Sequence, residues 1–346
     1  RRGGGAVCAW VKGIGCDRHS RGDGDVRRTP SYCEFDVACY DVIAYLVLVH
    51  RYPEQFGRLF KAIYDPANRY VVHVDKNSGP TLEAEIRDFL TAYPNTAVLQ
   101  TRKVLWGGYS LVDVELRGMA KLLEMSQDWE VFINLSGQDF PLKSQSQIAR
   151  FLARNRGKEF IRVLDQQQVR PDTMPRVQNY VVEWRDRIFR TRFTRRFLAG
   201  ATPYIGTQWM MVSRAFCQFV CHDRRADRYK GFYRHTFIAD EGFFQTVMMN
   251  TPVHGEIVFD DMRMIDWVPY GDIKLRPRTF TSQDAAALTA SPDLFARKFD
   301  MTVDDGVFDL LESHLRTQGI ANLPPANRPA ADPRLTTEVA SAVAVN

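Results

Sequence analysis

The chain has 346 residues, of which 45% are hydrophobic and 25% are charged. These proportions are typical of an ordinary soluble globular protein, and they exclude a disordered, fibrous or membrane-spanning chain. The longest apolar run near the start, 42–49, is far shorter than the roughly 20 residues that a transmembrane helix needs. The length suits one large domain or two ordinary ones.

Positive charge is concentrated in the segment that begins at Arg162 and ends at Arg196. It holds nine arginines and four acidic residues, an excess equal to the formal net charge of +5 of the whole chain. A solvated arginine-rich loop is the simplest interpretation, and contact with an acidic ligand or an anionic membrane surface is the alternative. Because nucleic-acid binders usually carry a more basic domain, we expect no nucleic-acid partner, although an Arg-rich nucleic-acid-binding protein stays as an alternative function.

Both ends of the chain differ in composition from its middle. Residues 1–41 are rich in Gly and Arg and lack an apolar period, and 319–346 are rich in Pro and Ala. We expect a poorly ordered leader, one domain over 42–318 and a disordered tail.

Apolar strands alternate with amphipathic helices in the middle of the chain. In order, the patterns predict a strand at 43–49, a helix at 53–64, a strand at 70–74, a helix at 81–93, a short strand at 97–100, a helix at 110–125, a strand at 130–135, a loop at 136–143, a helix at 145–156 and a strand through 210–212. This alternation predicts a mostly parallel α/β sheet with helices on both faces. Ligands of such sheets bind beyond the carboxyl ends of the strands, where His50, Asp75 and the 136–143 loop fall.

Several common signatures are absent from the sequence. No Gly-rich phosphate-binding motif follows the first strand, no G-x-S-x-G elbow exists, and no His-rich metal spacing is present. The acidic pair Asp260-Asp261 lacks the D-x-D spacing that many nucleotide-sugar transferases use for a metal. A bound diphosphate would therefore have its charge balanced by basic side chains.

Five motifs occur in a specific order. They are YVVHVDK at 70–76, VLWGGYS at 104–110, FINLSGQDFPLK at 132–143, ADEGFF at 239–244 and LFARKFD at 294–300. Together they resemble the core-2/I-branching N-acetylglucosaminyltransferases and peptide O-xylosyltransferases of glycosyltransferase family 14, over roughly 43–300. The resemblance implies a GT-A-like (Rossmann-like) fold, a UDP-sugar donor carrying GlcNAc or xylose, inversion at the sugar carbon, no cofactor and no divalent metal.

The same resemblance assigns the catalytic base to Glu241. An inverting transfer needs a base for the acceptor hydroxyl, and a partly desolvated carboxylate suits that task. A glutamate in the first turn of a helix, favoured by the helix dipole, is the alternative interpretation. We expect Asp240 to cap that helix or orient its neighbour.

Donor contacts follow from the resemblance in the same way. It places Asp75 on the uracil, Trp106 on the face of the base, and Arg263 and Lys298 on the leaving diphosphate, where no metal balances the charge. The alternatives are a loop-capping aspartate and two surface cations. The wall of the same pocket would be formed by Leu48, Val49 and His50, of which His50 could equally be a satisfied histidine at a strand end.

The acceptor site is the least defined part of the sequence. Candidate contacts are Asp139, Trp209 and Glu183; Trp209 is either a platform for a sugar ring or a core residue of its strand. We expect a glycan or glycolipid acceptor, or a peptide, and peripheral contact with an anionic membrane through the arginine-rich segment.

The sequence predicts an inverting, metal-independent glycosyltransferase of bacterial surface polysaccharide synthesis. We expect a cytoplasmic enzyme, peripheral to the inner membrane, with the Golgi lumen as the alternative if an anchor is missing from this chain. A catalytically inactive UDP- or glycan-binding module of the same fold is the alternative function.

Overall fold

A computed structural model of the chain describes residues 42–252, 254–270 and 273–318. These residues fall in one compact unit. The predicted leader at 1–41 and the predicted tail at 319–346 lie outside the described residues.

Seven strands form the central sheet, in the order β12–β6–β11–β4–β1–β2–β3. All neighbours run parallel except β11, which is antiparallel to both β4 and β6. The mostly parallel α/β sheet predicted from the sequence is therefore confirmed. The strands are β1 (Val42–Val49), β2 (Arg69–Val74), β3 (Thr96–Val98), β4 (Trp129–Ser136), β6 (Lys158–Ile161), β11 (Met210–Ser213) and β12 (Glu256–Val258).

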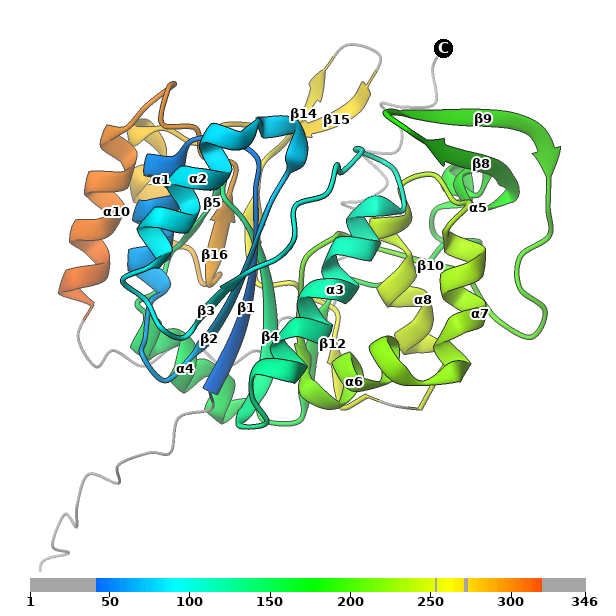
Figure 1. The fold of residues 1–346 in the computed structure, drawn as a ribbon, viewed down its shortest axis with the longest axis horizontal. Coiled ribbons are helices and arrows are strands. Elements are labelled where there is room, and N and C mark those ends of the chain that lie inside the picture. Colours follow the sequence, from blue (N-terminus) through cyan, green and yellow to red (C-terminus); the bar gives the residue numbers. More distant parts are fainter. Residues whose placement is uncertain (1–41, 253, 271–272, 319–346) are drawn as a thin grey trace, which may run out of the picture. The chain divides into compact units, whose positions relative to one another are not determined.

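Helices cover both faces of this sheet, as predicted (Figure 1). On one face, β1 contributes Tyr45 and Val47 to an apolar cluster with α1, α2, α4, α9 and α10. On the other face it contributes Ala44 and Leu46 to a cluster with α3, α6, α7 and α8. The helices are α1 (Pro53–Ile63), α2 (Pro80–Leu90), α3 (Ser110–Met125), α4 (Gln145–Arg154), α6 (Arg214–His222), α7 (Arg224–Tyr233), α8 (Phe243–Met249), α9 (Ala285–Ala290) and α10 (Gly306–Thr317). Because successive strand residues face opposite ways, a uniformly apolar strand supplies both clusters.

Smaller sheets lie outside the central one. One has three strands, with β16 parallel to β13 and antiparallel to β5. The others are two-stranded and pair β8 with β9, β7 with β10, and β14 with β15. The bounds are β5 (Asp139–Pro141), β7 (Leu164–Asp165), β8 (Asn179–Trp184), β9 (Arg187–Thr194), β10 (Tyr204–Ile205), β13 (Arg263–Ile265), β14 (Trp267–Tyr270), β15 (Ile273–Pro277) and β16 (Phe295–Arg297).

Local sequence signals account for several helix starts. Proline occupies the first position of α1 and of α2, where the missing N–H is not needed. Ser213 accepts a hydrogen bond from the Phe216 N–H at the start of α6. Ser144 and Gln147 form a reciprocal capping box at α4.

Four sequence predictions need correction. The helix predicted at 81–93 ends at Leu90, because the Thr91 and Tyr93 N–H groups donate to carbonyls three residues back in a tight turn. The helix predicted at 145–156 ends at Arg154, because the Asn155 amide donates to the Phe151 carbonyl (2.8 Å) and Gly157 has a φ of 78°. The loop predicted at 136–143 contains β5, which is a strand because it pairs with β16. The arginine-rich segment contains the β8–β9 hairpin rather than a simple loop.

Candidate active site

The carboxyl ends of β1, β2 and β4 lie together, as the parallel register requires. Val49 aligns with Val74, and Leu48 aligns with Ser136. The main chain of β1 then binds the loops that follow its neighbours: the Asp75 N–H donates to the Val49 carbonyl (2.8 Å). The Gly137 N–H donates to the Leu48 carbonyl (2.8 Å). Residues 48–50, predicted as a pocket wall, therefore organise this end of the sheet.

Asp75 joins two loops. Its Oδ1 accepts from the Asn77 N–H (2.9 Å), within the 3₁₀ turn η1 (Lys76–Ser78), and from the Val104 N–H (3.3 Å). Asp75 therefore does cap its loop, which was the alternative to a uracil contact. Both bonds go to Oδ1, and no residue in the described part of the chain donates to Oδ2, which is the oxygen available to a ligand N–H.

Trp106 projects from the loop that Asp75 holds. Its side chain is 69% exposed, and its ring meets Phe237 edge-on, with centroids 6.1 Å apart. Gly107 follows with a φ of 77°, and a methyl group there would lie 2.8 Å from the Phe237 ring. The double glycine therefore lets this loop lie close to Phe237 while the indole faces outward.

Glu183, predicted as an acceptor contact, lies behind the same loop. Its Oε2 accepts from the Ser110 N–H (3.0 Å) at the first turn of α3. A methyl group at Gly108 would lie 2.6 Å from that oxygen. The structure thus places Glu183 as a cap of α3 that supports the Trp106 loop, because a carboxylate is favourable at a helix N-terminus.

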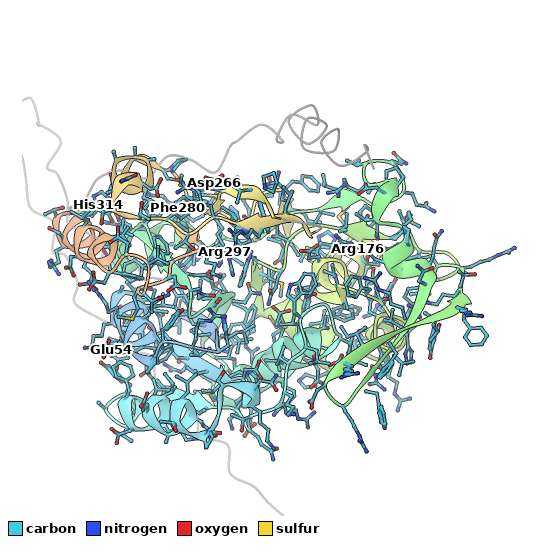
Figure 2. The ribbon with its side chains drawn as sticks, turned by 90° about the horizontal axis from the view of Figure 1, so that it is seen from above. Glu54, Arg176, Asp266, Phe280, Arg297 and His314 are labelled. Carbon is cyan, nitrogen blue, oxygen red and sulfur yellow. The ribbon has the colours of Figure 1, made fainter. Side chains whose placement is uncertain are left out.

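Glu241 ends the 3₁₀ turn η3 (Ala239–Glu241). Its Oε2 accepts from Arg176 Nη1 at 2.7 Å, and its carbonyl accepts from the Gly206 N–H at 2.8 Å. The carboxylate is about one-third exposed, so it meets solvent on one side. Arg176 comes from α5 (Pro175–Gln178), on the green part of the ribbon in Figure 2.

Asp240 is buried beside Glu241. It lies inside η3 and does not occupy the cap position, which is Ile238. Burial, followed by the charge of Glu241, raises the pKa of Asp240 to about 7. Asp240 is therefore next to Glu241 in the chain, but its side chain is buried while that of Glu241 is partly exposed to solvent.

A direct bond connects the turn of Glu241 with the loop of Trp106. The Ile238 N–H donates to the Gly107 carbonyl at 2.8 Å. The next residue toward the N-terminus, Phe237, is the one that contacts the Trp106 ring. The predicted base and the predicted base-stacking residue therefore belong to one connected unit, although they lie 135 positions apart in the sequence.

A group of cations surrounds His50. Burial, then the charges of Arg51, Lys298 and Arg297, lower the pKa of His50 to about 4. Burial, then Arg51 and Arg297, also lower the pKa of Lys298. This crowding of positive charge is suited to an anionic ligand. His50 stays neutral at pH 7 and contributes no charge of its own.

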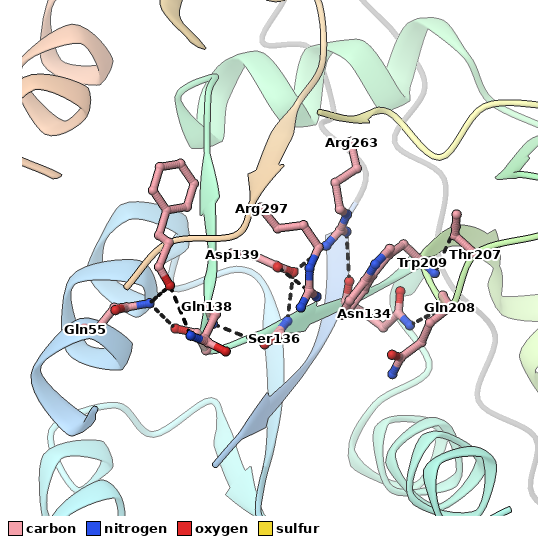
Figure 3. Close-up of polar contacts among 12 residues, drawn as sticks. Gln55, Asn134, Ser136, Gln138, Asp139, Thr207, Gln208, Trp209, Arg263 and Arg297 are labelled. Carbon is pink, nitrogen blue, oxygen red and sulfur yellow. Dashed lines mark hydrogen bonds and ion pairs between the residues drawn. The ribbon is translucent and has the colours of Figure 1, made fainter. Parts of the chain in front are cut away.

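Arg263 lies deeper than Lys298. Its guanidinium is fully buried and forms an ion pair with Asp139, and it donates to the Asn134 carbonyl (3.1 Å; Figure 3). Arg297 lies 3.2 Å from the other Asp139 oxygen. Besides Asp139, the buried carboxyl groups of Asp261 and Asp293 also act on Arg263, so carboxyl groups inside the protein balance the charge of this guanidinium.

The structure buries two of the residues that were predicted to contact the acceptor, Asp139 and Trp209. The Asp139 side chain has no exposed surface, because both arginines enclose it. Trp209 is 6% exposed, and its ring lies under Arg263 (4.4 Å) and Arg297 (4.3 Å). Neither residue faces an open acceptor site: Asp139 holds the arginines, and Trp209 is the core residue of the two alternatives.

Sequence reasoning did not single out Arg51 or Arg176. Arg51 follows His50 directly, so its position just after an apolar strand could have identified it as a candidate. Nothing local marks Arg176, because its partner Glu241 is 65 positions away. Arg297, next to the predicted Lys298, points toward Asp139 instead.

Comparison with known proteins agrees with these features. The family model of the core-2/I-branching enzymes matches residues 43–291. The chain belongs to this family. The family predicted from the five motifs is thereby confirmed, and the match covers most of the α/β domain described above.

The curated relatives are named as xylosyltransferases. The chain is 32% identical over 291 residues to xylosyltransferase 2 of Canis lupus familiaris and of Mus musculus, which covers 79% of this chain and 33% of each relative. It is equally similar to xylosyltransferase 1 of Rattus norvegicus, of which 35% is covered. The chain therefore spans about one third of the length of these relatives.

The described ranges contain neither a group of metal-ligating side chains nor a membrane-spanning helix. Within 42–252, 254–270 and 273–318, no group of three or more His, Cys, Asp and Glu side chains is arranged to hold a metal ion. None of the helices in those same ranges is long and apolar enough to cross a membrane.

Proposed function

We propose that this chain is an inverting glycosyltransferase that moves a sugar from a UDP-sugar to a hydroxyl group of a glycan, glycolipid or peptide acceptor. The observation that carries the proposal is the Gly107–Ile238 bond, which joins the loop of Trp106 to the turn of Glu241. Membership of a family whose relatives are named xylosyltransferases supports it. That name makes xylose the first donor sugar to test and GlcNAc the second.

In the proposed reaction, Glu241 accepts the proton of the acceptor hydroxyl as that oxygen attacks C1 of the donor sugar. The C1–O bond to UDP breaks, and UDP leaves with the bonding electrons. Arg176 holds Oε2 of Glu241, so Oε1 is the oxygen left for the acceptor proton. A carboxylate fixed in this way loses little orientational freedom when it acts as a base.

The leaving diphosphate would meet positive charge at the end of β1. Lys298 and Arg51 lie close enough to His50 for both charges to act on it, and they would contact the diphosphate. Arg263 lies behind them with its charge balanced by buried carboxyl groups, so it would support this end of the site through its bonds to Asp139 and to the Asn134 carbonyl. These cations support independence from a divalent metal, because they supply the charge that a metal would otherwise supply.

UDP release from a panel of UDP-sugars, with EDTA present, tests this proposal. We expect turnover with UDP-xylose or UDP-GlcNAc by the unaltered chain. Glu241→Gln should lower it by about 10²- to 10⁴-fold, while UDP still raises the melting temperature. Glu130→Gln, an exposed glutamate on β4, is the matched control. Loss of all turnover in EDTA, restored by Mg²⁺ or Mn²⁺, would contradict metal independence.

The inactive-module alternative makes a different prediction in the same assay. UDP would shift the melting temperature of both the unaltered chain and Glu241→Gln, and neither would turn over any donor, with or without the acceptors tested. Detectable turnover that Glu241→Gln removes would exclude this alternative.

We also propose that the β8–β9 hairpin contacts an anionic membrane, in a bacterial cytoplasmic setting with the Golgi lumen as the alternative. Three exposed aromatic side chains on this hairpin support the contact: Trp184 (58%), Phe189 (43%) and Phe193 (75%). Arg185, Arg187 and Arg192 are exposed beside them. Aromatic rings next to arginines suit the interface between headgroups and acyl chains.

Vesicle sedimentation tests the membrane contact. We expect binding to phosphatidylcholine vesicles with about a third phosphatidylserine, and loss of that binding in a Trp184→Ser/Phe193→Ser variant. Equal binding by the variant, or salt-sensitive binding to oligonucleotides instead of vesicles, would contradict this part of the proposal.

A further inference from the structure

Glu115 is a buried acid with no part in the reaction proposed above. It lies on the inner face of α3 and has no exposed surface. The same face carries Val112, Met119 and Leu122, so the pattern of the helix alone would place an apolar residue here. An acidic side chain in such a position needs hydrogen-bond partners, because burial without them is costly.

Two amides bind one of its oxygens. Oε1 accepts from Asn134 Nδ2 (2.8 Å) and from Gln208 Nε2 (3.1 Å). Asn134 is itself saturated, because Nδ2 also donates to the Gln208 carbonyl (2.9 Å) and Oδ1 accepts from the Met210 N–H (2.9 Å). The Glu115 carboxyl thus joins α3 to β4 and to residues 206–210.

Residues 206–210 connect the two chemical parts of the site, the turn of Glu241 and the buried arginines. At one end, the Gly206 N–H binds the carbonyl of Glu241. Near the other end, Trp209 lies under the two buried guanidinium groups. The Asn134 carbonyl also accepts from Arg263. Gln208, whose side-chain amide donates to Glu115, therefore lies within the segment that joins the turn of Glu241 to the buried arginines.

The surroundings of Glu115 favour its neutral form. β4 and residues 206–210 present amides, η3 presents Asp240, and β1, β2 and α6 add apolar side chains to the same cluster. Oε2 is buried without a hydrogen-bond partner among the described residues. Burial raises the pKa of Glu115 to about 8, the two amides lower it, and the nearby Asp240 charge raises it.

We propose that Glu115 is a positioning residue, held as a neutral carboxylic acid, that fixes residues 206–210 and so sets the spacing between the base turn and the buried arginines. This inference rests on the proposed glycosyl transfer. Ionisation would place a charge on the unpartnered Oε2, near a second carboxyl, and would disturb the segment that Gln208 belongs to.

Two substitutions separate this role from simple packing. Glu115→Gln keeps an oxygen for both amides and cannot ionise, so turnover at pH 7 should stay within about threefold of the unaltered chain. It should also remove the alkaline loss of kcat, which we expect with a midpoint near pH 8 in the unaltered chain. Glu115→Leu breaks both hydrogen bonds and should lower kcat about tenfold or more, with UDP affinity changed less than threefold.

A matched control exists in Glu159, which is also fully buried but lies on β6, where it binds Ser213 and Gly255. Glu159→Gln should leave the alkaline limb of the unaltered chain in place. An alkaline limb that is unchanged in Glu115→Gln would overturn the inference, even where Glu241→Gln has confirmed the proposed function.

Two measurements need no turnover. Hydrogen exchange of peptides spanning 204–212 should speed up in Glu115→Leu and stay unchanged in Glu115→Gln. The infrared difference spectrum between the unaltered chain and Glu115→Gln at pH 7 should contain the band of a protonated carboxyl, which disappears above about pH 9. Unchanged exchange in Glu115→Leu, or a carboxylate band at pH 7, would contradict the inference whether or not a donor is found.

Discussion

Trp106 is a large apolar side chain that the fold leaves exposed. Phe237 supports one edge of its ring, and the rest of the 69% exposed indole faces solvent. A rigid ring presented in this way suits stacking on a flat ligand, and stacking on one base contributes about 1–3 kcal/mol to binding.

Trp106→Ala should therefore weaken UDP binding by about 5- to 150-fold and change the melting temperature little, because the ring packs on few atoms. Isothermal titration with UDP measures the first effect, and a thermal melt measures the second. Trp184→Ala removes a similarly exposed indole, 58%, from the hairpin and serves as the control. Equal losses of UDP affinity in both variants would show that Trp106 has no special contact.

For single residues, the sequence motifs identify the candidates but not the residues that they contact in the folded protein. Asp75 and His50 could be placed at strand ends, because apolar runs end just before them. The pairing of Arg176 with Glu241 depends on how α5 packs against η3. The enclosure of Asp139 depends on the pairing of β5 with β16, which brings Arg297 opposite it. No local pattern contains either contact.

At the scale of elements, Glu183 joins the hairpin to α3 by a hydrogen bond to the Ser110 N–H. Glu183→Ala should reduce the free energy of unfolding by about 1 kcal/mol, the usual cost of losing a cap. Because the same carboxylate backs the Trp106 loop, we also expect a higher KM for the donor and an unchanged KM for the acceptor. Chemical denaturation and steady-state kinetics measure the two effects.

The control for this prediction lies at the other end of the same helix. Glu124 is exposed near the C-terminus of α3, where a negative charge is unfavourable, so Glu124→Ala should not destabilise the protein. A rise in acceptor KM without a rise in donor KM in Glu183→Ala would instead support the acceptor contact first expected for this residue.

The elements that could be predicted are those with a clear apolar pattern. α1 and α3 follow their patterns because each buries one regular face, and β1 and β2 do so because they are continuous apolar runs buried on both faces. β9 has no such pattern: most of its residues, from Arg187 to Thr194, are exposed, and it is a strand because it pairs with β8. β5 is likewise defined by its partner β16, so neither strand could be found from local sequence.

At the scale of the whole molecule, buried histidines and buried carboxylic acids change the free energy of unfolding in opposite directions as the pH rises. Burial lowers the pKa of His50 and of His73 to about 4, so these groups stabilise the fold as pH rises toward 6.5. Burial raises the pKa of Asp240 to about 7 and that of Glu115 to about 8. The folded protein therefore holds protons on these carboxyls that the unfolded chain has already lost, and it is destabilised as pH rises.

The histidine effect and the carboxyl effect oppose each other between about pH 4.5 and 6.5. In this range all four groups bind a different number of protons in the folded protein than in the unfolded chain. Above pH 6.5 the histidines are neutral in both states and no longer oppose the two carboxyls. The free energy of unfolding should then fall by about 2 kcal/mol between pH 6.5 and 8, on the scale of 1.4 kcal/mol per pKa unit. Urea denaturation across pH 5–9 measures it, and an Asp240→Asn/Glu115→Gln variant should show a clearly flatter profile above pH 6.5. A variant whose profile runs parallel to that of the unaltered chain would mean that these carboxyls are ionised in the fold at neutral pH.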